Sequence, residues 1–271
     1  MTIPTYRSYA LDLLAATTLE GKLAPPPAGI RDLEPGPPLR VDAPARPPGL
    51  EIVAGRLAKV PPLEGMADPR QRRRILHALA NHELQAAELF AWALLAFPDA
   101  PRDFRDGCLA ILAEEQQHLR MYIGRTEALG IRFGDEPVSG HFWRNVGRIR
   151  TPLQFVCTMG LTFESANLDF ALEHAAAARG AGDEATAAVL ERVHREEIRH
   201  VRFAWDRLVA WKDAAATPWD AYCANVPAPL GPSRGRSATF DEACRRAAGM
   251  DDAFVAHLAA TPPARPGGSP R

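Results

Sequence analysis

The stretch that decides the fold is Glu114-Glu115-Gln116-Gln117-His118, which lies within a long segment of helical apolar periodicity. Glu115 and His118 are three residues apart, about 300° around an α-helix, so their side chains point to the same side. The same Glu-x-x-His spacing recurs at Glu197 and His200. A carboxylate and an imidazole held side by side on a helix provide half of a metal site, so the sequence predicts two such halves.

Each Glu-x-x-His pair follows another acidic residue at nearly the same distance. Glu83 lies 32 residues before Glu115, and Glu164 lies 33 residues before Glu197. One Glu on each of two helices, with Glu-x-x-His on each of two others, is the ligand pattern of dinuclear metal sites in helical bundles. The predicted metal ligands are therefore Glu83, Glu115, His118, Glu164, Glu197 and His200.

Helix start and stop signals predict four long helices. The first begins at Asp68-Pro69 and ends near Phe97, and the second spans about 101–130. Thr151-Pro152 begins the third helix, which ends at Gly180, and the fourth runs from Asp183 to about Trp211. Asp or Thr followed by Pro is a typical start, and Gly a typical end. The short, long and short connections predict an all-α four-helix bundle with one long crossover.

The segments before the predicted bundle differ in composition. Residues 8–23 predict one short amphipathic helix. Residues 24–69 contain 12 of the 25 prolines, a density that excludes helix interiors and central strands. This proline-rich segment is either a disordered linker or an arm laid along the bundle, and its recurring apolar residues favour the arm.

The chain after the predicted bundle is irregular, with short helices expected at about 239–248 and 251–258. The last residues, 261–271, are rich in Pro, Gly, Ser and Arg, and we expect a mobile tail. The predicted division is an N-terminal helix and arm (1–67), the bundle (68–211) and a C-terminal extension (212–271).

All four predicted acidic ligands fall on apolar helical faces. A buried carboxylate without a partner costs several kcal/mol, and converging carboxylates repel one another. Two divalent cations would balance the four charges, and two imidazoles would complete the ligand set. The alternative is an ordinary helical bundle in which these Glu and His side chains lie at the surface.

Other polar residues near the predicted ligands have alternative interpretations. Glu88 is rotated by about 140° from Glu83, so we interpret it as an outward or supporting group. Tyr122, one turn after His118, either hydrogen-bonds a metal ligand or exchanges an electron with the metals, or it only packs in the core. Gly160 either opens space beside the metals or lets two helices pack closely. We interpret three histidines as structural or supporting groups: His77, His82 and His194. Of these, His194 is the best placed to be a further ligand.

Composition excludes several classes of protein. The formal net charge of −1 provides no global field to attract nucleic acid or acidic membranes. The four cysteines form no Cys-x-x-Cys pair, which argues against a zinc ribbon or rubredoxin-type iron centre and suits a reducing cytoplasm. No signal peptide or membrane span is evident, so we expect a cytoplasmic protein.

Beyond the ligand pattern, the sequence resembles the ferritin-like superfamily, most closely an uncharacterised branch described as a ferritin-like domain of unknown function. That branch is distantly similar to a tRNA-modifying di-iron hydroxylase. The resemblance covers about 65–212 and rests on His82 to Ala86, Trp92 to Leu95, Phe97 to Asp99, Phe142-Trp143 and Glu197 to His200. It implies an Fe/Fe or Mn/Fe site with oxygen or peroxide chemistry, and it raises tRNA as one possible substrate.

The expected function is therefore that of an oxygen-activating di-iron oxidoreductase, a hydroxylase or oxidase with O₂ as co-substrate. It would use a small-molecule substrate and an external reductant, as a monomer or a dimer. The alternative is a ferritin-like or rubrerythrin-like ferroxidase or peroxide scavenger. A metal-free scaffold is the third class.

Overall fold

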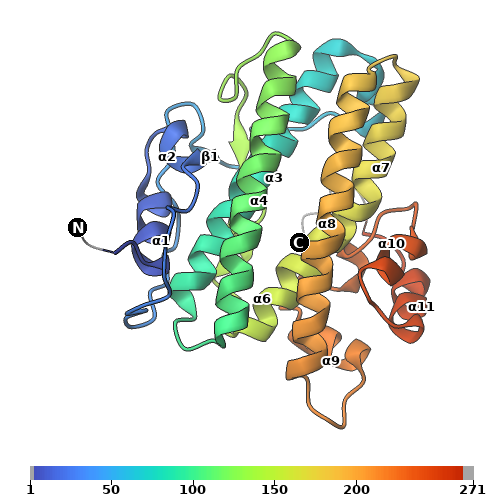
Figure 1. Ribbon diagram of the computed structural model, residues 1–271. Coiled ribbons are helices and arrows are strands. Elements are labelled where there is room, and N and C mark those ends of the chain that lie inside the picture. Colours follow the sequence, from blue (N-terminus) through green and yellow to red (C-terminus); the bar gives the residue numbers. More distant parts are fainter. Residues whose placement is uncertain (1–2, 265–271) are drawn as a thin grey trace. The chain divides into compact units, whose positions relative to one another are not determined.

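The computed structural model describes residues 3–264, which are mostly helical (Figure 1). This confirms the all-α class. Residues up to Gly147 form one compact unit, and residues from Arg148 onward form a second. The boundary between the units falls inside the range predicted for the bundle, 68–211, and the three-part division stays a prediction. Among residues 3–264, no helix combines the length and apolar character needed to cross a membrane.

The first unit is built on a hairpin of two long helices, α3 (Pro69–Ala96) and α4 (Arg102–Ala128), which run side by side (Figure 1). The Asp68 carboxylate accepts the backbone N–H of Arg70 at 2.8 Å, and Pro69 occupies the first turn of α3. Both features are typical of a helix N-terminus. A 3₁₀ turn, Leu63–Ala67, precedes α3.

The predicted single helix over 8–23 is wrong, because the segment forms α1 (Tyr6–Ala15) and α2 (Leu19–Leu23). Thr18 is the reason for the break. Its backbone is extended, and its hydroxyl accepts the N–H of Gly21 at 3.1 Å. Thr18 therefore starts a new helix instead of continuing the first one.

The proline-rich segment is an arm that runs over the first unit. The Leu39 N–H donates to the Leu95 carbonyl at 2.9 Å, and the Ala45 N–H donates to the Leu14 carbonyl at 2.9 Å. Leu50 is buried. In the same arm, β1 (Ile52–Val53) pairs in parallel with β2 (Val138–Ser139). The arm thus contacts α3, which also packs against α4 and α1, and this helix is buried on almost every side from Glu83 onward.

Glu88 holds part of this arm in place. Its carboxylate lies 2.9 Å from Lys22 Nζ and 2.7 Å from Arg46 Nη2, and it accepts the Trp143 Nε1–H at 2.9 Å. All of these contacts are buried. The interpretation of Glu88 as an outward group is therefore wrong, and its supporting role is structural.

The long connection after α4 carries β2 and the short helix α5 (Trp143–Val146). His77, on α3, fixes the start of this connection, because its Nε2 accepts the Gly134 N–H at 2.9 Å. Burial lowers the pKa of His77 from its ordinary value of 6.5, while Glu136 and Asp135 oppose the shift by their charge. The neutral imidazole is the form that accepts this hydrogen bond.

We expect the protein to lose stability through His77 as the pH falls below about 6.5. The unfolded chain takes up a proton there, and the folded chain resists it. In His77→Gln the amide oxygen can still accept the Gly134 N–H but does not titrate, so unfolding free energies measured from pH 7.5 to 5 should fall less steeply. His257→Gln, at an exposed histidine, is the control. Parallel curves for the wild type and His77→Gln would contradict this expectation.

The second unit contains the other hairpin. Its first half consists of α6 (Pro152–Thr158), a π-helical segment (Met159–Glu164) and α7 (Ser165–Gly180). Its second half is α8 (Glu184–Trp211). Figure 1 shows α7 and α8 running side by side. Thr151 caps the start of α6 as predicted, and Asp183, the predicted start of the fourth helix, caps α8. The π-helical segment was not predicted, and it interrupts the expected continuous helix over 151–180.

Three short helices follow: α9 (Pro218–Asn225), α10 (Glu242–Ala247) and α11 (Asp252–Ala260). A 3₁₀ turn, Pro232–Arg234, lies before α10. The last two helices match the predicted ones, whereas α9 lies where irregular chain was predicted. Thr217 caps α9 by accepting the Asp220 N–H at 3.1 Å. The predicted mobile tail, 261–271, is only partly described. Within it, Ala264 donates its N–H to the Ser233 carbonyl at 2.7 Å, and 265–271 lie outside the described residues.

Candidate metal centre

The first unit brings three of the predicted ligands together. Glu83 comes from α3, and Glu115 and His118 come from successive turns of α4. His118 Nδ1 lies 3.7 Å from the Glu83 carboxylate and 3.5 Å from that of Glu115. One ligand atom from each residue lies within 4.8 Å of the other two, and all three side chains are buried. We call these residues the first Glu/His cluster.

Electrostatics in this cluster favour a bound cation. Burial, and then the charge of the nearby Glu115 carboxylate, raise the pKa of Glu83 well above its ordinary value, while His118 opposes the shift. Two buried carboxylates so close together resist being charged at the same time. A divalent cation among them would reverse this preference, because the ionised carboxylates would then be its ligands.

The second unit brings the other three predicted ligands together. Glu164 ends the π-helical segment, and Glu197 and His200 lie on successive turns of α8. The Glu197 carboxylate lies 3.1 Å from His200 Nδ1. One ligand atom from each of the three residues lies within 4.8 Å of the other two, and all three are buried. These residues form the second Glu/His cluster.

Asn167 supports this second cluster and was not predicted. Its amide donates to Glu197 Oε1 at 3.4 Å, from a position one turn after Glu164 on α7. Hydrogen bonds of this kind orient a carboxylate that binds metal. A polar residue one turn from a predicted ligand was the only signal in the sequence, and such residues are common on helices.

The other residues singled out in the sequence are a tyrosine and two histidines, and they have different surroundings. Tyr122 is buried on α4, one turn after His118, and its role beside the metals stays a prediction, as a hydrogen-bond donor to a ligand or in electron exchange. His82 lies against the Phe142 ring, with 5.2 Å between centroids, as expected of a structural histidine. His194 points its Nε2 at Cys244 Sγ, 3.2 Å away, and not at the Glu197 that follows it by one turn.

These features define a mostly helical protein in which each of two units carries a buried Glu/His cluster that could hold a metal ion. Residues 9–256 match the model of the family described as "Protein of unknown function (DUF455)". The chain belongs to this family. A comparison with curated proteins finds no match, and a comparison with solved structures finds none either.

Proposed function

We propose that the protein is an oxygen-activating di-iron oxidoreductase, a hydroxylase or oxidase with the fold of a ferritin-like four-helix bundle. The observation that carries the proposal is the pair of buried clusters, each with two carboxylates and one imidazole. The connection lengths and the doubled Glu-x-x-His spacing in the sequence support the bundle with one crossover.

The donor atoms fit iron. Each cluster offers oxygen and nitrogen ligands and no sulfur, a set that suits Fe(II) or Mn(II) better than soft metals. One divalent cation per cluster balances the charge of its two carboxylates. Glu83, Glu115 and His118 would hold one ion, and Glu164, Glu197 and His200 would hold the other. When bound, the two irons would supply the electrons and open coordination positions that oxygen activation requires.

The chain contributes placement and charge. His118 and His200 each stand beside a carboxylate on the same helix, so the rigid backbone fixes the separation of their ligand atoms. Asn167 orients Glu197. We propose a small molecule as the substrate, since a net charge of −1 offers no support for binding tRNA. The electrons would come from a separate, external reductant.

Metal analysis and oxygen uptake test the proposal. The protein purified with iron should contain about two iron ions per chain, as in dinuclear carboxylate bundles, and the Fe(II)-loaded protein should consume O₂. Glu115→Ala should lose bound iron and oxygen uptake. Glu127→Ala, at an exposed position on the same helix, is the matched control. Magnetic coupling between the irons in Mössbauer spectra would test whether the two ions form one centre.

Two results would contradict the proposal. Absence of stoichiometric iron or manganese would favour a metal-free scaffold, and unchanged oxygen uptake in Glu115→Ala would separate the activity from the clusters. A large multi-subunit assembly that stores iron would instead favour the ferritin-like alternative.

A further inference from the structure

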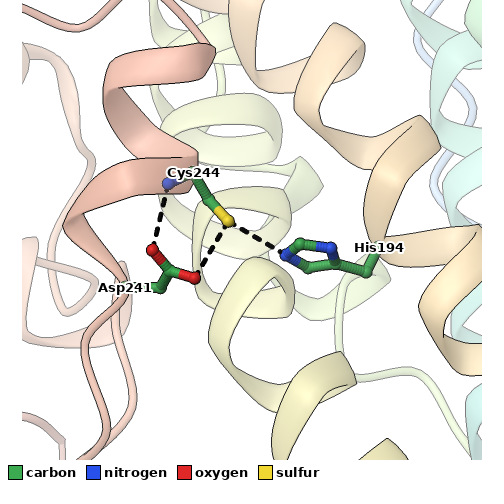
Figure 2. Close-up of side chains that lie close together, drawn as sticks. All are labelled: His194, Asp241 and Cys244. Atoms are coloured by element: carbon green, nitrogen blue, oxygen red, sulfur yellow. Dashed lines mark hydrogen bonds between the residues drawn. The ribbon is translucent and has the colours of Figure 1, made fainter.

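A third group of metal-ligating side chains lies in the second unit, separate from the Glu/His clusters. His194 on α8 meets Asp241 and Cys244 at the start of α10, and Figure 2 shows the three side chains pointing toward one another. Cys244 Sγ lies 3.2 Å from His194 Nε2 and 3.0 Å from Asp241 Oδ2. One ligand atom from each residue lies within 4.8 Å of the other two.

The local backbone holds Asp241 and Cys244 in this arrangement. Asp241 is the N-cap of α10, and its Oδ1 accepts the Cys244 N–H at 3.0 Å. This bond leaves Oδ2 directed at the sulfur. One carboxylate therefore fixes the helix start with one oxygen and faces the cysteine with the other.

A buried ion pair fixes this part of the chain to α7. The Arg245 guanidinium donates to both carboxylate oxygens of Asp169, at 2.7 and 2.9 Å, and both side chains are fully buried. Asp169 also accepts the backbone N–H groups of Ser237 at 2.9 Å and Asp241 at 3.0 Å. The residue after Cys244 and the backbone of Asp241 are thus both anchored, which pre-organises the group facing His194.

The geometry is unlike that of a cysteine nucleophile. In a nucleophilic triad the acid orients the histidine, but here Asp241 contacts the sulfur. Burial, and then the hydrogen bond to Asp241 and its charge, raise the pKa of Cys244 to about 12. A thiol that keeps its proton is a poor nucleophile, whereas a metal ion can displace the proton and bind the thiolate.

We propose that His194, Asp241 and Cys244 form a zinc-binding site with one position open to solvent or ligand. Sulfur, nitrogen and oxygen donors suit Zn²⁺, which three protein ligands hold when the fourth position is open. A tetrahedral zinc ion would separate the ligand atoms by roughly 3.3–3.7 Å, so the sulfur contacts would open by a few tenths of an ångström. The thiol proton leaves to solvent, and the partial exposure of Asp241 and Cys244 gives the ion an entry path.

Cobalt(II) substitution in the full-length reduced protein tests the proposal. Tetrahedral Co(II) bound to a thiolate gives a near-ultraviolet charge-transfer band and visible bands, and Zn²⁺ should displace it. The Glu/His clusters contain no sulfur, so the charge-transfer band reports a cysteine ligand whether or not those clusters bind iron. We expect the band in the wild type and in Cys223→Ser, which removes an exposed cysteine.

Cys244→Ser should abolish the band and weaken zinc binding by roughly 100-fold or more, since even outer-shell changes cost 10–100-fold. Asp241→Asn keeps a good N-cap, so it should fold normally and bind zinc roughly tenfold more weakly. Circular dichroism and thermal unfolding would verify the fold of each variant. Absence of the band in the wild type, or an unchanged band in Cys244→Ser, would overturn the proposal and leave only a thiol–imidazole hydrogen bond.

Discussion

Replacing Glu88 by Gln should destabilise the protein by about 3–5 kcal/mol, the range for breaking a buried ion pair by removing one partner. The carboxylate lies between the buried cations of Lys22 and Arg46. Burial lowers the pKa of Lys22, and the charge of Glu88 opposes that shift. Without the carboxylate, two cations would face each other in a site closed to water, and the arm that carries Arg46 would lose one of its contacts with α3.

Denaturant unfolding of Glu88→Gln, with Glu127→Gln as an exposed control on α4, measures this loss. Lys22→Met in the Glu88→Gln background should recover part of it, because it removes one of the two stranded charges. A loss below 1 kcal/mol in Glu88→Gln, similar to that of Glu127→Gln, would mean that the arm is held by its backbone hydrogen bonds and apolar contacts instead.

Glu88 also shows where sequence reasoning reached its limit in the fold. The starts of α3 and α8 followed from Asp68 and Asp183, because capping is a local property. The environment of Glu88 is not local. Lys22, on α2, and Arg46, on the arm, lie 66 and 42 residues earlier in the chain, and no periodic pattern describes the path of the arm. Its burial could therefore not be predicted from the helix that carries it.

The candidate metal ligands can be divided in the same way, into those that a local pattern predicts and those that it does not. Glu115 and His118 could be predicted as a pair because three-residue spacing on a helix fixes their relation. His194 and Cys244 are 50 residues apart, and neither belongs to a recognisable metal motif. Only the packing of α10 beside α8 brings them together, so the contact between this histidine and Cys244 could not be predicted from the sequence.

We expect Gly160→Ala to destabilise the second unit by about 1–3 kcal/mol, the usual cost of overpacking. A Cβ at Gly160 would lie 2.2 Å from the Cβ of Ala204 and 3.6 Å from its Cα. Cβ atoms are fixed to the backbone and cannot rotate away, so the π-helical segment or α8 would have to move. This contact supports the interpretation of Gly160 as a site of close helix packing.

Such a movement should also reach the second Glu/His cluster. Glu164 lies four residues after Gly160, and His200 lies four residues before Ala204, so each ligand is one turn from the contact. Gly160→Ala should therefore lower the unfolding free energy and, under the proposed function, the iron content as well.

The exchange variant Gly160→Ala/Ala204→Gly separates this contact from other effects of the substitution. It moves the methyl group from one helix to the other, so the space between them is filled as before. We expect it to be more stable than Gly160→Ala alone, with only the cost of glycine in α8 remaining, about 1 kcal/mol. Under the proposed function it should also regain the capacity to bind iron. If the exchange variant were no more stable than Gly160→Ala, the backbone of the π-helical segment would require glycine for a reason other than Ala204.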